Sequence, residues 1–253
     1  IKKLAELAHS FDIPLIMDNT VATAYLVKPL SLGADIVVNS TSKYINANSS
    51  AISGVITDGG KFKWDTEKYP GMKDFKKFGP FAYTAKLRNG LFRNTGACLS
   101  PHNAFYNSIG METLGLRMER VCDNAKTLAQ FFATEYSDIE VNYPGLAGSK
   151  WHNIATEQFG DKFGGIITIR TGNKKRAFGI IDALKLPLIV SNIGDTKTLV
   201  IHPESTLNVH STQEEKETAG VFDDLIRISV GIEDIEDLID DFKQAIESVK
   251  DVY

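Results

Sequence analysis

The sequence predicts an α/β fold: a mainly parallel sheet with helices on both faces, followed by a smaller α+β domain. Two short apolar runs, residues 13–17 and 36–38, are continuous, which is typical of strands buried on both faces. Apolar positions between residues 103 and 135 recur at helical spacing. After them, residues 165–170 and 225–230 alternate, which predicts half-buried strands. We therefore place the domains at residues 1–112 and 113–253.

A separate sequence pattern predicts each of the remaining helices and strands. Residues 1–9 predict an amphipathic helix whose apolar face comprises Ile1, Leu4, Leu7 and Ala8. Because the chain starts inside this helix, we expect it to begin in the middle of a fold. Residues 51–57 predict a third strand, and residues 61–83 a loop-rich stretch. The helix over 103–135 is expected to be continuous, with a kink at Gly110 or Gly115. Residues 177–184 and 234–249 predict two more helices.

Composition narrows the class of partner. The 253 residues include 28 Lys plus Arg and 32 Asp plus Glu, a net charge of -4, which disfavours nucleic acid and anionic membranes as partners. The apolar runs are far shorter than the roughly 20 residues that a membrane-spanning helix needs. Two cysteines, Cys98 and Cys122, are too few for a disulfide scaffold. We therefore expect a cytoplasmic protein that acts on a small molecule.

A candidate cofactor site follows the first two strands. Asp18 ends one predicted strand, and Ser40, Ser42 and Lys43 follow the next. The carboxyl ends of parallel strands line the ligand crevice of such sheets. A desolvated lysine amine is a nucleophile for an aldehyde, hydroxyl groups hold phosphate, and a carboxylate keeps a pyridine nitrogen protonated. Together these groups predict a pyridoxal phosphate site, although a solvated loop and a helix N-cap at Asp18 remain alternatives.

A second group of polar residues lies in the later domain. Arg227 is expected on the face of its strand opposite Ile226 and Ile228, where its guanidinium can bind a substrate carboxylate in two parallel hydrogen bonds. Asn192 follows a predicted strand and can orient the same carboxylate. The alternatives are a surface ion pair of Arg227 with Asp223 or Asp224, and a simple turn at Asn192.

Two other groups of residues do not indicate a binding site. The five histidines, His9, His102, His152, His202 and His210, show no metal-ligand spacing, so no metal site is expected. The stretch Gly145-Leu146-Ala147-Gly148-Ser149-Lys150 lacks the spacing of a phosphate loop.

The order of the motifs resembles a known family. In chain order they are Met17-Asp18-Asn19-Thr20, Ser40-Thr41-Ser42-Lys43-Tyr44, Glu112-Thr113-Leu114-Gly115-Leu116-Arg117, His202-Pro203 and Leu225-Ile226-Arg227-Ile228-Ser229-Val230-Gly231. They are similar to the cystathionine gamma-synthase-like family of pyridoxal phosphate enzymes of cysteine and methionine metabolism, which has the type I fold. The stretch Asn192-Ile193-Gly194-Asp195 is most similar to the O-acetylhomoserine sulfhydrylase branch.

The resemblance implies an activity and residue roles. The branch makes homocysteine from O-acetylhomoserine and sulfide, with pyridoxal 5'-phosphate as cofactor. By resemblance, Lys43 is the Schiff-base lysine, Asp18 the partner of the ring nitrogen, Ser40 and Ser42 phosphate contacts, and Asn192 and Arg227 the holders of the substrate carboxylate. Two departures, Ala47-Asn48 and Leu207-Asn208, stand where many relatives have Gly-His and Thr-His, and they bear on substrate preference.

The resemblance leaves alternatives. A γ- or β-lyase of the same family acting on cystathionine or methionine is one, and a non-catalytic fragment or scaffold subunit is another. Relatives carry a further upstream stretch, so this chain is expected to be the carboxyl-terminal part of such an enzyme, with the upstream part supplied by another chain or missing. The family also implies a homo-oligomer, a tetramer.

Overall fold

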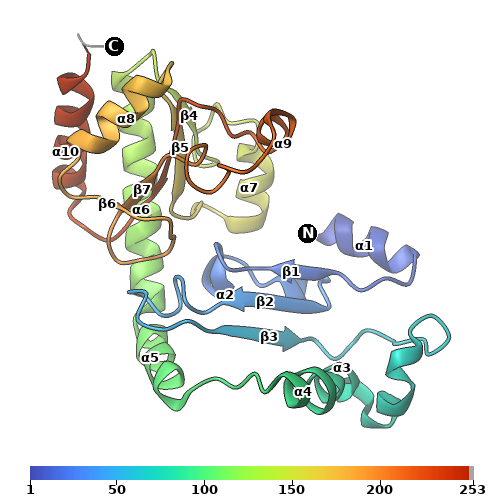
Figure 1. The fold of residues 1–253 in the computed structure, drawn as a ribbon. Coiled ribbons are helices and arrows are strands. Elements are labelled where there is room, and N and C mark those ends of the chain that lie inside the picture. The colour runs from blue at the N-terminus through green and yellow to red at the C-terminus, as the bar shows by residue number, and fades with distance from the viewer. Residues whose placement is uncertain (251–253) are drawn as a thin grey trace. The chain divides into compact units, whose positions relative to one another are not determined.

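The computed structural model describes residues 1–250 and forms two compact units. The first unit comprises Ile1–Asn46 and Ser50–Met111, and the second comprises Ala47–Ser49 and the chain from Glu112 onward. The colour ramp in Figure 1 follows the chain through both units. Each unit has a sheet of its own, so each is described by itself.

The first unit is built on a three-stranded sheet in the order β1-β2-β3. Its strands are β1 (Ile16–Asp18), β2 (Ile36–Ser40) and β3 (Gly54–Asp58). β1 and β2 are parallel, as their continuous apolar runs predict, whereas β3 is antiparallel to β2. The described part of this sheet is therefore mixed. The reason is the connection: residues 41–53 contain no helix, and a parallel return usually needs one. The expectation that both parallel strands are buried on both faces is wrong for β1: Ile36 and Val37 of β2 are buried, but Ile16 and Asp18 of β1 are exposed.

Short helices and helical turns form much of the rest of this unit. The first unit contains α1 (Lys2–Ser10), α2 (Thr23–Leu26), a 3-10 turn (Pro29–Leu32), a run of 3-10 turns (Pro70–Phe81), α3 (Ala82–Lys86), a π-helical turn (Leu87–Phe92), α4 (Arg93–Thr95) and α5 (Pro101–Glu112). The helix predicted over residues 1–9 is confirmed, and two residues of its apolar face remain exposed. Leu4 and Leu7 are 56% and 58% exposed, because α1 approaches the unit through Ala5, which packs closely on Gly33.

The single helix predicted over residues 103–135 is two helices. α5 ends at Glu112 and α6 (Leu114–Glu135) begins after Thr113, so the break falls between the two glycines at which a kink was expected. Thr113 has φ -108° and ψ 4°, outside helical geometry, and its Oγ1 accepts a hydrogen bond from Arg117 Nε at 3.1 Å. The non-helical backbone at Thr113 therefore separates the two helices.

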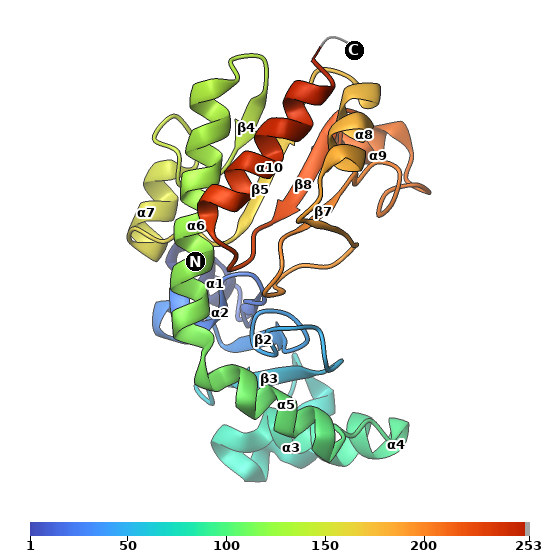
Figure 2. The same cartoon turned by 90° about the vertical axis from the view of Figure 1, so that its left-hand side faces the viewer.

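The second unit contains a five-stranded sheet in the order β4-β5-β8-β7-β6. Its strands are β4 (Glu140–Asn142), β5 (Ile166–Arg170), β6 (Leu188–Ile189), β7 (Leu199–Ile201) and β8 (Leu225–Ser229), and only β6 and β7 are parallel. Its helices after α6 are α7 (His152–Phe159), α8 (Lys174–Ala183), α9 (Gln213–Thr218) and α10 (Ile235–Ser248). α6, α8 and α10 cover one face of the sheet (Figures 1 and 2).

The core of this unit follows the predicted alternation. Ile226 and Ile228 of β8 are fully buried among the helices, together with Phe132 of α6 and Phe242 of α10, whose rings meet edge to face at 5.2 Å. Arg227, between the two isoleucines, points to the other face and is half-buried. The predicted face assignment of this strand is therefore confirmed.

Two classes of feature are absent from the described chain. Within residues 1–250, no helix combines the length and the apolar character needed to cross a membrane. The same residues hold no cluster of three or more His, Cys, Asp or Glu side chains arranged to bind a metal ion.

Candidate cofactor and substrate sites

Asp18 and Ser40 lie at the carboxyl ends of two neighbouring strands of the first sheet. They are the last residues of β1 and β2, and the parallel register pairs Asp18 with Val38, so Ser40 extends two residues further. Two hydrogen bonds continue past the paired residues of β1 and β2. Asn19 N–H donates to Val38 O at 2.8 Å, and Ser40 N–H donates to Thr20 Oγ1 at 2.8 Å. The structure thus brings together two of the predicted site residues from separate strands.

Both side chains border one cavity. It has a volume of about 1010 Å³, and its walls come from the ends of β1 and β2, from β3, and from the segment between Thr84 and Leu99. Lys43 is three residues beyond Ser40, in the turn that leaves β2, and its side chain is half-buried. The turn is closed by Lys43 N–H, which donates to Ser40 O at 3.4 Å. The candidate lysine therefore lies in the loop that emerges from the cavity edge.

Asp18 and Ser42 already have partners within the chain. Asp18 is exposed, and its Oδ1 accepts a hydrogen bond from Thr20 N–H at 2.9 Å, which makes an Asx turn. It does not cap α2, since the residue before that helix is Ala22. Ser42 Oγ donates to Ser53 O at 3.1 Å and accepts from Ser53 N–H at 2.8 Å. Ser42 thus ties the lysine turn to the strand that follows it.

A network of buried polar side chains holds the turn that carries Lys43. The sequence patterns did not indicate this network. Asn107 of α5 is 8% exposed, and its Nδ2 donates to Ser53 Oγ at 2.9 Å and to Thr41 Oγ1 at 3.3 Å. Thr41 Oγ1 in turn donates to Ser53 Oγ at 2.6 Å. Asn46, 3% exposed, accepts from Ser50 N–H at 2.8 Å. Buried polar groups that satisfy one another hold a loop in one conformation.

A glycine brings α5 onto the same turn. A Cβ atom at Gly110 would lie 2.2 Å from Ile45 O and 2.8 Å from Asn46 O. The helix backbone can therefore approach the turn only because this residue has no side chain. Gly110 and Asn107 lie one helical turn apart on α5, and both contact the segment that carries Lys43.

The two predicted carboxylate-binding residues meet in the second unit. Arg227 NH2 donates to the backbone carbonyl of Asn192 at 3.1 Å. The loop that carries Asn192 is closed by Gly194 N–H, which donates to Ser229 Oγ at 3.0 Å. Asp224, an alternative ion-pair partner for Arg227, instead binds Arg170 Nε at 2.9 Å. The fold thus brings the Arg227 guanidinium to the backbone of Asn192, although 35 residues separate them along the chain.

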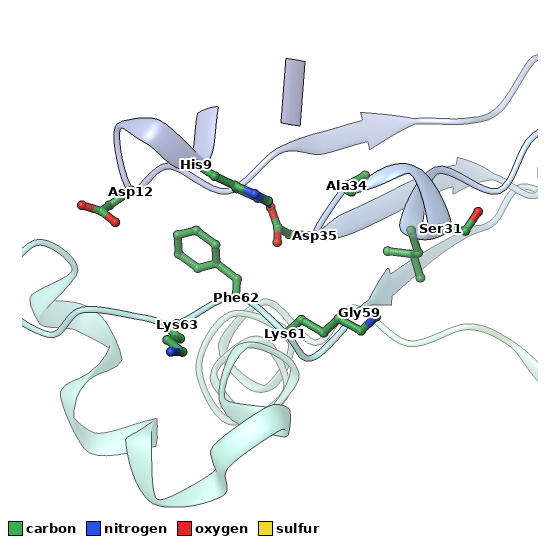
Figure 3. A pocket seen from close by; sticks show the side chains of 11 residues that line it. His9, Asp12, Ser31, Ala34, Asp35, Gly59, Lys61, Phe62 and Lys63 are labelled. Carbon is green, nitrogen blue, oxygen red and sulfur yellow. Dashed lines mark hydrogen bonds and ion pairs between the residues drawn. The ribbon is translucent and has the colours of Figure 1, made fainter. Parts of the chain in front are cut away.

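A second cavity of the first unit lies away from this chemistry. It has a volume of about 610 Å³, and its residues include Asp35, which precedes β2, and Gly59, which follows the antiparallel β3. It therefore borders the opposite edge of the sheet from Asp18. Figure 3 shows the His9 ring directed at Asp35, with the Phe62 ring beside the pair; His9 Nε2 and Asp35 Oδ2 are 2.7 Å apart. Since open α/β sheets bind ligands at the carboxyl ends of their strands, the larger cavity is the better candidate.

Comparison with known proteins gives the family. Residues 1–247 match the model of a family described as Cys/Met metabolism PLP-dependent enzyme. The chain is 42% identical to the O-acetyl-L-homoserine sulfhydrylase of Corynebacterium glutamicum, over 96% of this chain and 59% of that protein. It is 38% identical to the L-methionine gamma-lyase of Fusobacterium nucleatum subsp. polymorphum, over 98% of this chain and 58% of that protein.

A solved structure gives the fold. A chain from Campylobacter jejuni, described as a putative O-acetylhomoserine (thiol)-lyase with N'-pyridoxyl-lysine-5'-monophosphate, matches with a TM-score of 0.91 and 34% identity, over 97% of this chain and 62% of that one. The predicted α/β class and type I fold are therefore confirmed. This chain spans between 58% and 62% of the length of these three relatives.

The side chains present fit pyridoxal phosphate. The cofactor has an aldehyde, a pyridine nitrogen and a phosphate, and the edge of the first sheet offers an amine, a carboxylate and hydroxyl groups. Asp18 and Ser40 border one cavity from neighbouring strands, and the loop that carries Lys43 starts at Ser40. With the family model matched over nearly the whole sequence, the chain belongs to the Cys/Met metabolism PLP-dependent enzyme family.

Proposed function

We propose that the protein containing this chain converts O-acetyl-L-homoserine and sulfide to L-homocysteine and acetate. The observation that carries the proposal is the placement of Asp18 and Ser40 at one cavity beside the turn of Lys43. The choice of reaction is supported by the 42% identity to a sulfhydrylase. Because the chain spans 59% of that relative, the activity is proposed for the whole protein rather than for these residues alone.

We assign the cofactor contacts from the chemistry of the side chains. Lys43 Nζ would join the cofactor through its aldehyde carbon, and the Asp18 carboxylate would accept a hydrogen bond from the protonated ring nitrogen. Ser40 and Ser42 would donate to the phosphate. For Ser42 this requires an exchange, since its hydroxyl proton is engaged with Ser53 O. When bound, pyridoxal phosphate supplies the electron sink that makes the substrate Cα proton acidic.

The chain's own residues then have defined tasks. The Lys43 amine would remove the Cα proton and transfer protons between Cα and Cβ. Acetate leaves from Cγ, and sulfide adds at the same carbon. Asn192 and Arg227 would hold the substrate carboxylate throughout. The guanidinium is suited to this task because its hydrogen bond to Asn192 O restricts its orientation.

A second candidate function is a γ- or β-lyase. The observation that favours it is the 38% identity to L-methionine gamma-lyase over 98% of this chain. Both candidates use the same cofactor contacts, so the described residues support them equally. We favour the sulfhydrylase because of the 42% identity to one member of that class and the Asn192-Ile193-Gly194-Asp195 motif.

We also propose a subunit arrangement and a cellular compartment for the protein. The family resemblance favours a homo-oligomer, a tetramer, and the low cysteine content favours the cytoplasm. Sedimentation of the whole protein at several concentrations would measure the subunit number.

The test compares Lys43→Ala with Lys28→Ala, an exposed lysine of the same unit. We expect the first variant to lose the long-wavelength absorbance of bound cofactor and the second to retain it. Sulfide-dependent consumption of O-acetylhomoserine, set against ammonia and keto-acid release from methionine, separates sulfhydrylase from lyase. Retention of the absorbance in Lys43→Ala would contradict the lysine assignment, and absence of it in the unmodified protein would favour a non-catalytic scaffold.

A further inference from the structure

The short segment Ala47–Ser49 belongs to the second unit although it follows the cofactor lysine in sequence. Three hydrogen bonds attach it to the loop around Asn192. Thr196 N–H donates to Ala47 O at 2.8 Å, Ser49 Oγ donates to Asp195 Oδ2 at 2.8 Å, and Asn192 Nδ2 donates to Ser49 Oγ at 2.8 Å. Two of these three bonds are made by one hydroxyl group.

The backbone of this segment is strained. Ala47 has φ 84° and Ser49 has φ 59°, in the left-handed region that residues with a side chain seldom adopt. Such a conformation persists only where the surroundings hold it in place. Here the three hydrogen bonds do so, and the strained turn delivers the Ser49 hydroxyl between Asn192 and Asp195.

The direction of these hydrogen bonds determines the orientation of the Asn192 amide. A carboxylate only accepts, so the Ser49 hydroxyl must donate its single proton to Asp195. The hydroxyl oxygen can then only accept from Asn192, which must present its NH2 group and not its carbonyl. If Asp195 were absent, the hydroxyl could rotate and either end of the amide could face it.

The Asp195 carboxylate is held in place and can only accept hydrogen bonds. Its side chain is only 9% exposed, and its Oδ1 accepts from Lys197 N–H at 3.0 Å. Burial raises the pKa of the Asp195 carboxyl, but the hydrogen bonds from Lys197 N–H and the Ser49 hydroxyl outweigh it, so that the pKa lies below its ordinary value. The carboxylate is therefore ionised at neutral pH and acts as an acceptor.

We infer that Ser49 is a positioning residue that, through Asn192, sets how strongly the enzyme selects substrates carrying an α-carboxylate. An amide nitrogen carries two hydrogens, so the end of Asn192 that donates to Ser49 can also donate to a carboxylate, whereas an amide oxygen cannot; selection therefore depends on which end of Asn192 is held at Ser49. The inference rests on the proposed role of Asn192 in holding the substrate carboxylate.

Three variants separate the hydroxyl from the backbone strain. Ser49→Ala removes the hydroxyl and keeps the strain, Ser49→Gly removes both, and Ala47→Gly relieves strain while it keeps the hydroxyl. In thermal unfolding we expect Ala47→Gly to raise the midpoint above that of the unmodified protein and Ser49→Gly to lie above Ser49→Ala. These shifts report the backbone and also show that each variant is folded.

The selectivity measurement uses two ligands that differ only in the carboxylate, L-homoserine and 3-aminopropan-1-ol. Their dissociation constants are measured for the whole holoenzyme from the change in cofactor absorbance, without turnover. We expect the preference for homoserine to fall about tenfold in Ser49→Ala and Ser49→Gly, as for a lost hydrogen bond, and to be unchanged in Ala47→Gly. In turnover, KM should rise in the two Ser49 variants with kcat changed less than about twofold.

The outcomes are distinct. An unchanged preference in both Ser49 variants, or an equal fall in Ala47→Gly, would overturn the role of the hydroxyl. No preference in the unmodified enzyme would overturn the carboxylate site at Asn192 and this inference with it. A clear preference in an enzyme that does not use sulfide would leave the inference standing and remove only the proposed reaction.

Discussion

Replacement of Gly110 by alanine tests whether helix α5 supports the lysine turn. The new Cβ would lie 2.2 Å from Ile45 O and 2.9 Å from Asn46 C, whereas ordinary contact begins at 3.4 Å. The turn or the helix must therefore move by more than 1 Å. Both atoms belong to backbone, so no flexible side chain can relieve the contact.

The expected cost follows from two opposing terms. Overpacking of this kind costs about 1–3 kcal/mol. Alanine in place of glycine inside a helix returns about 1 kcal/mol. We expect a net loss of up to about 2 kcal/mol in the free energy of unfolding. Gly90→Ala is the matched control, because Gly90 lies in a helical segment and a Cβ added to it would have no atom within 4 Å, so this variant should be neutral or stabilising by up to about 1 kcal/mol.

The assay is urea unfolding of the whole protein, followed by tryptophan fluorescence, with cofactor affinity measured in parallel. Gly110→Ala should unfold at lower urea with an unchanged slope and bind pyridoxal phosphate more weakly, because Ile45 is two residues from Lys43. If Gly110→Ala and Gly90→Ala unfold alike and bind cofactor alike, the contact between α5 and the turn does not have the role assigned to it.

Two further predictions concern titrating groups. Hydrogen bonds from Lys174 and Lys216, at 2.8 and 2.5 Å, lower the pKa of Glu204 from 4.5 to about 2. Their stabilisation is present above pH 4.5 and is lost as the pH falls toward 2, so thermal midpoints should drop across that range and drop less in Glu204→Gln; equal drops would contradict the prediction. Burial raises the pKa of the Cys122 thiol to about 11, so a thiol reagent at about pH 8 should modify exposed Cys98 and spare Cys122 until the protein unfolds, as mass spectrometry of the labelled peptides would show. Labelling of both at one rate would refute it.

Local pattern was sufficient for much of the fold. The helices α8 and α10 and the two faces of β8 follow from apolar spacing, because burial of one side of an element is written into its own residues. The continuous apolar runs also located β1 and β2, although two of the three residues of β1 are exposed. The sharing of one sheet edge by Asp18 and Ser40 could also be predicted, since parallel strands end at the same edge. The direction of β3 and the break at Thr113 could not, because the first depends on the connection between two strands and the second on the backbone conformation of a single residue.

The sequence by itself therefore determined the α/β class and indicated the residue types of the proposed cofactor and carboxylate sites. Only the tertiary structure decided what supports them. Asn107 meets Ser53 across 54 positions of the chain, and Asn192 meets Ser49 across 143. Such pairs leave no periodic signal, because a hydrogen bond between distant loops depends on how the backbone folds and not on the spacing of residues within one element.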